Sequence, residues 1–522
     1  MNQFPNPDML HYYSPCSKSL NRSLKCDLCI YGGTSGGIAA AVTAKRLGLS
    51  VIVLETSRHP GGLTAGGLGL TDIGNKQAIG GISREFYRNV GKYYGVDEHW
   101  RFEPHVAELV FQDWIRAEQI EIHYDTFLAR VELRDNKLTR VWTENGLEVS
   151  AGMFLDCSYE GDLMSAAQVT YTVGRESNAH YGETLNGAQV RDQNQFNLPV
   201  NPYVVEGDPA SGLLPGIEAG LPVAGEGDHR VQAYNFRLCL CKNPSNQMPF
   251  TEPDDYERSR YELLVRYLRA GHVPDFRKFD TLVNDKVDLN NCYGFSTDYI
   301  GYNHAFPRAS YLAREAIFQS HVSHIKGLLW FWKQDPAVPR TFQEPFQQWG
   351  WTKDEFIDCG GFSHALYIRE SRRMVGDVVM TEHHCNGAQI VEDSIALAAY
   401  NMDSHNCRRF ARDGRVLNEG DVQVPCGPPY PISYRAVIPR RGECENLLVP
   451  FCLSASHIAF GSIRMEPVFM ILAESSVHAA LLALRNGSAL QDVQYDMLRE
   501  QLLKAGQVLD PVQRASDPQS GH

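Results

Sequence analysis

Short apolar runs around a glycine-rich turn dominate the first sixty residues of the chain. Residues 26–31 form a compact apolar run, residues 38–47 carry apolar side chains at helical spacing, and residues 51–54 form a second run of β-branched character. Strand, turn, helix and strand within about 30 residues make a βαβ unit, whose crossover forces the two strands to be parallel. This pattern predicts an α/β fold built on a Rossmann-like, mostly parallel sheet.

The pattern changes twice further along the chain. Residues 121–140 alternate as strands around a turn, and residues 152–157 are another short buried strand. Between 189 and 352 the βαβ rhythm is lost among prolines and aromatic residues, although a helix is expected over 256–270. A strand over 446–451 and a helix over 466–485 then resume the first domain. We expect a leader (1–24), the first part of the Rossmann-like domain (25–188), an inserted α+β domain (189–352), the return of the first domain (353–500) and a C-terminal tail (501–522).

The turn after the first strand has most of a dinucleotide fingerprint. Against G-x-G-x-x-G, the first and third glycines are Gly32 and Gly37, while Thr34 stands at the second glycine. The following helix offers free N–H groups and a partial positive charge to a pyrophosphate. A threonine is tolerable there if its hydroxyl contacts phosphate or water. The predicted phosphate-binding residues are Gly32, Gly33, Thr34, Ser35, Gly36 and Gly37.

An acid stands where a nucleotide ribose is expected. Glu55 ends the second strand about 18 residues after Gly37, followed by Thr56. A carboxylate there accepts hydrogen bonds from ribose hydroxyls and disfavours a 2′-phosphate, which argues against NADP. The glycines that follow suit backbone lying against a longer extended ligand, so FAD is favoured over NAD. These further cofactor candidates are Gly61, Gly62, Leu63 and Gly67.

Several longer stretches resemble the FAD-dependent oxidoreductases of the glutathione-reductase-like, two-dinucleotide-binding superfamily. Among them the chain is closest to a bacterial group of which some members carry the label xanthan lyase. The resembling stretches are 31–41, 60–72, 80–87, 155–176, 297–314, 367–380 and 446–469. The resemblance implies that Asp156, Glu160 and Asp162 close the FAD site, and that Ser454 and Ile463 belong to a segment passing the flavin ring. This chain departs from the family at Phe451, where glycine is usual, and at 473–476, where small residues usually begin the helix.

No second glycine fingerprint follows a later strand, so a separate NADPH-binding domain is not expected. A small-molecule substrate would then reduce the flavin, and oxygen or another acceptor would reoxidise it. We therefore expect a dehydrogenase or oxidase that passes a hydride to flavin N5, with a carbohydrate or polyol as the favoured substrate. The alternatives are a monooxygenase served by a separate reductase and a non-catalytic flavin-binding protein. No group of residues supports lyase activity.

Candidate catalytic groups lie in two places that the resemblance puts near the flavin. His457 is the first candidate for the base, because a histidine pKa lies near neutrality, and Arg464 could hold a carboxylate or the flavin edge. Tyr302, Asn303 and His304 come from the inserted domain and could face the ring from the substrate side. Each of these residues also has a structural alternative: backbone hydrogen bonding, a turn or an ion pair.

Arginines and other histidines supply weaker signals. Arg369 and Arg372 could bind an anionic or polyhydroxyl substrate, although a buried ion network would explain them equally well. His59 stands near the position where some flavoenzymes attach FAD covalently. His383 and His384 lack a ligand set at suitable spacing, so no metal is expected.

Composition restricts the partners and the compartment. The net charge of −13 over 522 residues argues against nucleic-acid binding. Residues 1–25 lack the apolar core of a signal peptide, and no apolar run of about 20 residues suggests a membrane span. Thirteen cysteines without a framework spacing favour free thiols in a reducing, cytoplasmic compartment. The oligomeric state stays open.

Overall fold

The main sheet grows from the predicted βαβ unit. The computed structural model describes residues 10–16 and 20–511. Strand order is β3-β2-β1-β6-β5-β4; β3, β2, β1 and β6 are parallel, β5 and β4 add an antiparallel meander, and β21 joins β6 in parallel. The strands are β1 (Arg22–Tyr31), β2 (Val51–Leu54), β3 (Glu121–His123), β4 (Leu128–Arg134), β5 (Lys137–Thr143), β6 (Leu147–Asp156) and β21 (Leu447–Leu448). The expected α/β class with a Rossmann-like sheet is confirmed. Strand β1 begins at Arg22, inside the segment expected to be a leader.

Both faces of this sheet are buried, which explains the unbroken apolar runs in the sequence. Successive side chains of a strand point to opposite faces. Leu28 and Ile30 therefore enter the core beneath the helices, while Cys29 and Tyr31 enter a second core beneath the meander. The continuous hydrophobicity of residues 28–31 follows from this burial on two sides.

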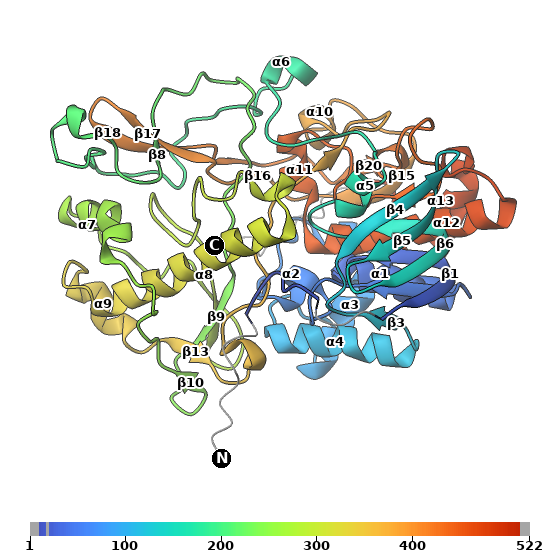
Figure 1. Cartoon of the computed structure of the whole chain (residues 1–522), viewed down its shortest axis with the longest axis horizontal. Coiled ribbons are helices and arrows are strands. Elements are labelled where there is room, and N and C mark those ends of the chain that lie inside the picture. Colours follow the sequence, from blue (N-terminus) through green and yellow to red (C-terminus); the bar gives the residue numbers. More distant parts are fainter. Residues whose placement is uncertain (1–9, 17–19, 512–522) are drawn as a thin grey trace.

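The helices of the Rossmann-like body lie to the right in Figure 1. α12 packs along α1, and both contact α3. Of the described helices, α12 alone has the length and hydropathy of a membrane span, and 94% of its most apolar window is buried. Core packing therefore accounts for its composition. The helices of this body are α1 (Ser35–Arg46), α2 (Gly62–Ala65), α3 (Gly81–Tyr93), α4 (Pro104–Ala117), α5 (Asp162–Ala166), α11 (His457–Ile463), α12 (Glu466–Asn486) and α13 (Tyr495–Lys504).

A second body, on the left in Figure 1, is built around an antiparallel sheet ordered β10-β13-β9-β12-β11. The long helix α8 crosses in front of this sheet, and together they enclose a separate hydrophobic core. Its elements are β9 (Leu238–Cys241), β10 (Gln247–Met248), α7 (Glu262–Arg269), β11 (Phe279–Thr281), β12 (Lys286–Leu289), α8 (Tyr311–Gln334), α9 (Arg340–Phe346) and β13 (Gly350–Thr352).

Small sheets follow the inserted body before the chain returns to the main sheet. β17 pairs with β18 and also with β8, so residues beyond 400 build structure together with the inserted segment. The main sheet resumes only at β21. The remaining α-helices and β-strands are β7 (Tyr171–Thr172), α6 (Asn178–Tyr181), β8 (Ile217–Glu218), β14 (Arg373–Met374), α10 (Glu382–Cys385), β15 (Ser394–Ala398), β16 (Met402–Ser404), β17 (Arg408–Arg412), β18 (Arg415–Glu419), β19 (Val422–Val424) and β20 (Tyr430–Ser433).

Residues 10–16 form a strap across the two bodies. The backbone N–H groups of Tyr12 and Tyr13 donate to Glu315 on α8, at 2.7 and 2.8 Å. The Tyr13 hydroxyl donates to Glu144 of the Rossmann-like body at 2.8 Å. This described part of the expected leader therefore bridges both bodies.

Candidate cofactor and substrate site

The glycine turn places the start of α1 against the ends of β1 and β6. Gly32 has φ +101°, and a Cβ on Gly37 would lie 1.8 Å from the Gly32 carbonyl oxygen. Only glycine fits at this close approach. The first-turn N–H groups of α1 have no intrahelical acceptors, and those of Ser35 and Gly36 are available to a pyrophosphate.

Thr34 has a structural role that explains its place in the turn. Its Oγ1 accepts from the Gly37 N–H at 3.2 Å, capping α1, and donates to the Cys157 carbonyl at 2.9 Å. The hydroxyl thus fixes the turn to the end of β6. Threonine is about as good an N-cap residue as glycine, so Thr34 can replace the usual glycine without weakening the helix start.

Glu55 is buried at the end of β2 and faces the turn. Its carboxylate accepts from the Ser57 N–H at 2.6 Å and also from the Gly33 N–H. Burial raises its pKa, and these donors oppose that rise. The carboxylate is therefore held between the glycine turn and Thr56, at the edge where a ribose is expected.

An open cavity with an empty volume of about 700 Å³ lies over these residues. It continues into a neighbouring cavity of about 910 Å³, and Thr56, Ser57 and His59 line both. The wall of the first cavity includes Gly32, Thr34, Glu55, Thr56, Gly62 and Glu160. His11 and Tyr12 of the strap complete it. The glycine turn, the helix start and the buried acid at one cavity fit the ADP half of a dinucleotide.

The three predicted acids after β6 have different surroundings. Asp156 turns inward, accepting from the Ser158 hydroxyl at 2.6 Å and the Met164 N–H at 2.8 Å, and burial raises its pKa to about 6. Asp162 is paired with Arg314 at 2.6 Å and with Arg372 at 2.7 Å. Only Glu160 lines the cavity, where it accepts from the Tyr12 hydroxyl.

The second glycine cluster divides between the cofactor cavity and the domain junction. Gly61 donates to the Gly33 carbonyl at 2.7 Å, and Gly62 begins α2 beside Thr34. Leu63 donates from its backbone to the Tyr159 hydroxyl at 2.9 Å. A Cβ on Gly67 would lie 2.3 Å from the Arg237 carbonyl, so this glycine serves the contact with the inserted body.

A smaller and much narrower cavity lies beyond Tyr159, which lines both spaces. Phe451 stacks on Phe469 with ring centroids 4.1 Å apart, and Tyr159 meets Phe451 edge-on at 5.4 Å. This aromatic group separates the two spaces. The smaller cavity is lined by Leu63, Tyr159, Tyr367, Ile368, Arg369, Glu370, Phe451, Phe460, Arg464 and Phe469.

The predicted catalytic and substrate residues do not all converge here. Arg369 and Arg464 line the smaller cavity, whereas His457 is 2% exposed and reaches it only through Glu370, 2.8 Å from its Nδ1. Burial lowers the His457 pKa well below its ordinary value. Ser454 and Ile463 are fully buried beside this segment.

The inserted-domain candidates lie elsewhere. Tyr302 stacks on Tyr299 at 3.8 Å and is 37% exposed. Asn303 is buried and donates to the Gln232 carbonyl at 2.7 Å. His304 accepts from the Val231 N–H at 3.4 Å, and burial lowers its pKa to about 4. None of the three lines the smaller cavity.

One buried acid that was not predicted from the sequence lies beside Tyr159, which lines both spaces. The carboxylate of Glu466, in the first turn of α12, accepts from the Ser35 hydroxyl at 2.5 Å, the Thr64 hydroxyl at 2.7 Å and the Tyr159 hydroxyl at 2.9 Å. Burial raises its pKa. A Glu-Pro pair opening an apolar helix was the available signal, because these residues favour a first turn.

The family model for FAD dependent oxidoreductases matches residues 27–502. The chain belongs to this family. FAD is therefore its cofactor, and the expectation of an FAD-dependent oxidoreductase enzyme is confirmed. The glycine turn and Glu55 would hold the ADP half of FAD.

No curated relative matches the chain. Solved structures match only part of it. A flavin-containing monooxygenase from Stenotrophomonas maltophilia is 15% identical over 30% of this chain and 43% of its own, with a TM-score of 0.19. Bacillithiol disulfide reductase Bdr from Staphylococcus aureus is 15% identical over 26% of this chain and 38% of its own, with a TM-score of 0.20. Thioredoxin reductase from Streptococcus pyogenes is 23% identical over 25% of this chain and 34% of its own, with a TM-score of 0.18. The chain thus spans less than half the length of each, and scores this low carry no inference about it.

Proposed function

We propose that this oxidoreductase is a dehydrogenase or oxidase that takes a hydride from a small polar substrate, with a carbohydrate or polyol as the favoured class. The observation that carries the proposal is a pair of buried guanidiniums in the smaller cavity. Among the described residues, Nε of Arg369 and Nε of Arg464 have no hydrogen-bond partner, although both side chains are almost fully buried. A buried donor without an acceptor is costly, and substrate oxygens in this cavity would satisfy both.

Each residue of the cavity then has a distinct task. When bound, FAD supplies the hydride acceptor at its N5 atom. Arg369 and Arg464 bind and orient the substrate oxygens, and their pairing with Asp298 and Asp403, at 2.9 Å each, keeps the cavity close to electrically neutral. Such neutrality favours hydroxyl groups over a strongly anionic ligand. Phe460 excludes water from the same space.

His457 is proposed as a positioning residue. Its Nε2 is 3.0 Å from the Ser404 hydroxyl and its Nδ1 2.8 Å from the Glu370 carboxylate. Glu370 also accepts from Gln232 at 3.2 Å and pairs with Arg373. A carboxylate held this way accepts a hydrogen bond from a substrate hydroxyl in a fixed geometry.

The proposal also covers the compartment in which the protein works and the acceptor that reoxidises its flavin. The described residues include all thirteen cysteines and contain no disulfide, which supports a reducing, cytoplasmic location. Oxygen or a carrier would reoxidise the cofactor. Binding of nucleic acid or membrane is not proposed.

Anaerobic addition of sugars and polyols to the FAD-loaded protein tests the substrate class. The flavin absorption band should bleach with at least one of them, without NADPH or a reductase. Bleaching only when a reductase system is added would favour a monooxygenase instead. If the protein holds FAD and the flavin bleaches neither with the sugars and polyols nor with the reductase system, the proposed dehydrogenase activity is excluded.

The role of His457 needs a readout that separates positioning from folding. His457→Ala should slow flavin reduction at saturating substrate, while His457→Asn, which keeps a side-chain donor, should restore part of the rate. His383→Ala, in α10, is the matched control. Equal rates of flavin reduction in the wild type and the three variants would show that His457 does not position the substrate site.

A further inference from the structure

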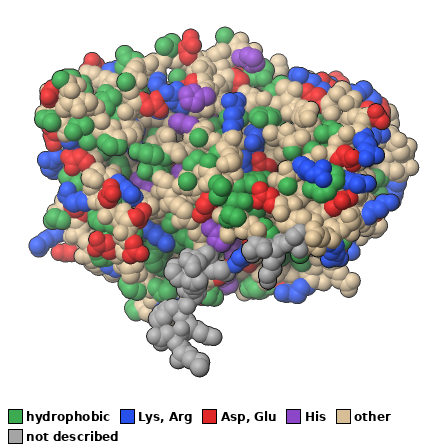
Figure 2. All heavy atoms as spheres, in the orientation of Figure 1, with side chains coloured by type: hydrophobic (Ala, Val, Ile, Leu, Met, Phe, Trp, Pro, Cys, Tyr) green, Lys and Arg blue, Asp and Glu red, His purple; other side chains and the backbone are tan. Residues whose placement is uncertain are grey.

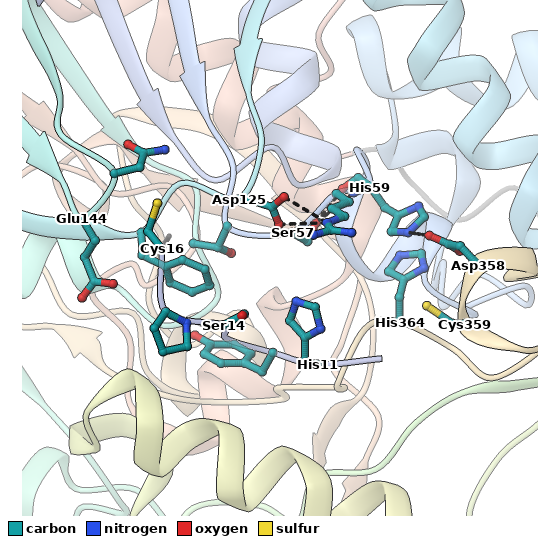
Figure 3. A pocket seen from close by; sticks show the side chains of 16 residues that line it. His11, Ser14, Cys16, Ser57, His59, Asp125, Glu144, Asp358, Cys359 and His364 are labelled. Atoms are coloured by element: carbon teal, nitrogen blue, oxygen red, sulfur yellow. Dashed lines mark hydrogen bonds and ion pairs between the residues drawn. The ribbon is translucent and has the colours of Figure 1, made fainter. Parts of the chain in front are cut away.

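Side chains of three ligand types converge beside the nucleotide cavity. One ligand atom each of His59, Asp358 and Cys359 lies within 4.8 Å of the other two. His59 comes from the loop after β2, whereas Asp358 and Cys359 form a short 3-10 turn (Ile357–Cys359) after the inserted body. Figure 3 shows the three side chains together at one end of the cavity.

We propose that His59, Asp358 and Cys359 bind a divalent metal ion, with Zn²⁺ as the best fit. Imidazole, carboxylate and thiolate together are a zinc-type set, since magnesium and calcium prefer oxygen ligands alone. Zinc–ligand bonds of about 2.0–2.3 Å place tetrahedral ligands roughly 3.3–3.8 Å apart. His59 Nε2 and Asp358 Oδ2 already lie 3.0 Å apart, so small side-chain shifts complete the geometry.

The other nitrogen of His59 is held as it is in many metal sites. Nδ1 lies 3.2 Å and 3.3 Å from the two carboxylate oxygens of Glu108 on α4. Metal-binding histidines usually donate their second ring N–H to a carboxylate, which fixes the tautomer and points the other nitrogen at the ion. Glu108 therefore orients Nε2 toward Asp358 and Cys359.

A neighbouring histidine offers a further ligand atom. The His364 ring stacks on His59 with centroids 4.0 Å apart (Figure 3). Both of its ring nitrogens are buried and, within residues 10–16 and 20–511, neither has a hydrogen-bond partner. The adjoining cavity of about 910 Å³ leaves room for a rotated imidazole or a water as the fourth ligand.

A second group of possible metal ligands in the same molecule differs from the His59 group. Glu103, His105 and Glu355 also converge, but the Lys286 ammonium lies among them, 2.6 Å from Glu103 and 2.7 Å from Glu355. A cation thus already satisfies that group. No lysine or arginine pairs with His59, Asp358 or Cys359 among the described ion pairs; Asp358 pairs with the His59 ring instead, so a bound metal ion would replace the proton on Nε2.

Metal analysis of the tag-free, FAD-loaded protein tests the proposal. After dialysis against Zn²⁺ and removal of free ion, we expect about one zinc per chain. Substitution with Co²⁺ should add thiolate-to-cobalt and d–d absorption bands, and the d–d bands lie outside the flavin band. Cys359→Ser should abolish the thiolate band and weaken binding at least tenfold. Cys292→Ser, a partly buried thiol of the inserted body, should change neither.

A second variant keeps the test decisive if Cys359→Ser fails to fold. Glu108→Gln leaves all three ligands in place and should weaken zinc binding about 10–100-fold, as expected for loss of the orienting carboxylate. The proposal is overturned if the folded, FAD-loaded wild type takes up neither metal. Equal zinc affinity in the Cys359, Glu108 and Cys292 variants would overturn it as well.

Discussion

The carboxylate of Glu466 accepts a 2.5 Å hydrogen bond from the hydroxyl of Ser35, joining the first turn of α12 to the first turn of α1. These residues are 431 positions apart in the chain. The same carboxylate accepts hydrogen bonds from the hydroxyls of Thr64 and Tyr159, so it ties α2 and Tyr159, which lines both cavities, to the start of α12. Its contacts hold the start of α12 against α1 and α2.

Replacement of Glu466 by glutamine should destabilise this junction. Glutamine has one oxygen where three hydroxyls now donate, and its amide brings donors of its own. We expect the free energy of unfolding to fall by about 1–3 kcal/mol, with faster loss of FAD. Urea titrations of Glu466→Gln and of Glu500→Gln, an exposed helix pair with Lys504, provide the measurement and its control. Equal stability of the two variants would contradict this role.

The cap at Thr34 should be measurable separately. Thr34→Val keeps the shape of the side chain but removes the acceptor for the Gly37 N–H, which should cost about 1 kcal/mol of stability. Thr34→Ser retains the hydroxyl and should remain close to wild type. A calorimetric comparison of the two checks this, and a valine variant as stable as the serine variant would show that the cap contributes nothing.

The sequence predicted the parts of the molecule whose contacts are local. The βαβ unit, the glycine turn and Glu55 lie within about 30 residues, and the periodicity of buried strands and helix marks them directly. α12 was predicted as a helix over 466–485 and runs over Glu466–Asn486. In these elements, the positions that are hydrophobic in the sequence are the ones that are buried in the fold.

Side-chain partners from distant segments were not predictable in this way. Glu466 has partners in three separate segments, and His59 meets Asp358 across 299 positions. His457 looked like a base because of its pKa and its place in the chain. Burial and the Glu370 contact, which depend on tertiary packing, put it behind the cavity wall. The orientation of a side chain within a core is fixed by packing against its neighbours, and the hydrophobic periodicity of the sequence does not predict it.

Gly37 should tolerate no side chain. A Cβ there would lie 1.8 Å from a backbone oxygen that cannot move without opening the turn. Gly37→Ala should therefore lose about 1–3 kcal/mol of stability and most of its bound FAD. Gly442→Ala, where a Cβ would meet nothing within 4 Å, is the matched control. The flavin-to-protein absorbance ratio after gel filtration reports the difference, and equal ratios would refute the close-approach argument.

Glu474 should make stability depend on pH. It is buried in α12, accepts from the Ile82 N–H at 3.0 Å at the start of α3, and burial raises its pKa from 4.5 to about 7. The folded state then binds this proton more tightly than the unfolded state. Its contribution is complete below about pH 4.5 and is lost as pH rises through about 7, by up to about 3 kcal/mol.

Glu474→Gln should remove that part of the pH dependence, because the amide resembles the protonated acid at every pH. Unfolding free energies of both proteins from about pH 5 to about pH 8 would be compared. As pH rises, the unfolding free energy of the variant should increase relative to that of the wild type. A constant difference across this range would mean that Glu474 does not titrate there.

The strap should slow the release of FAD. The Tyr12 hydroxyl donates to Glu160 at 2.8 Å and accepts from Arg314 at 3.2 Å, and Tyr12 lines the cavity over the glycine turn. Tyr12→Phe removes both bonds at an estimated cost of about 1.4 kcal/mol, which corresponds to roughly tenfold faster dissociation. Recovery of flavin fluorescence after dilution measures this rate. Tyr93→Phe, which loses an exposed bond to Asp113, should release FAD at the wild-type rate. If the two variants release FAD equally fast, the strap covers the cavity without retaining the cofactor.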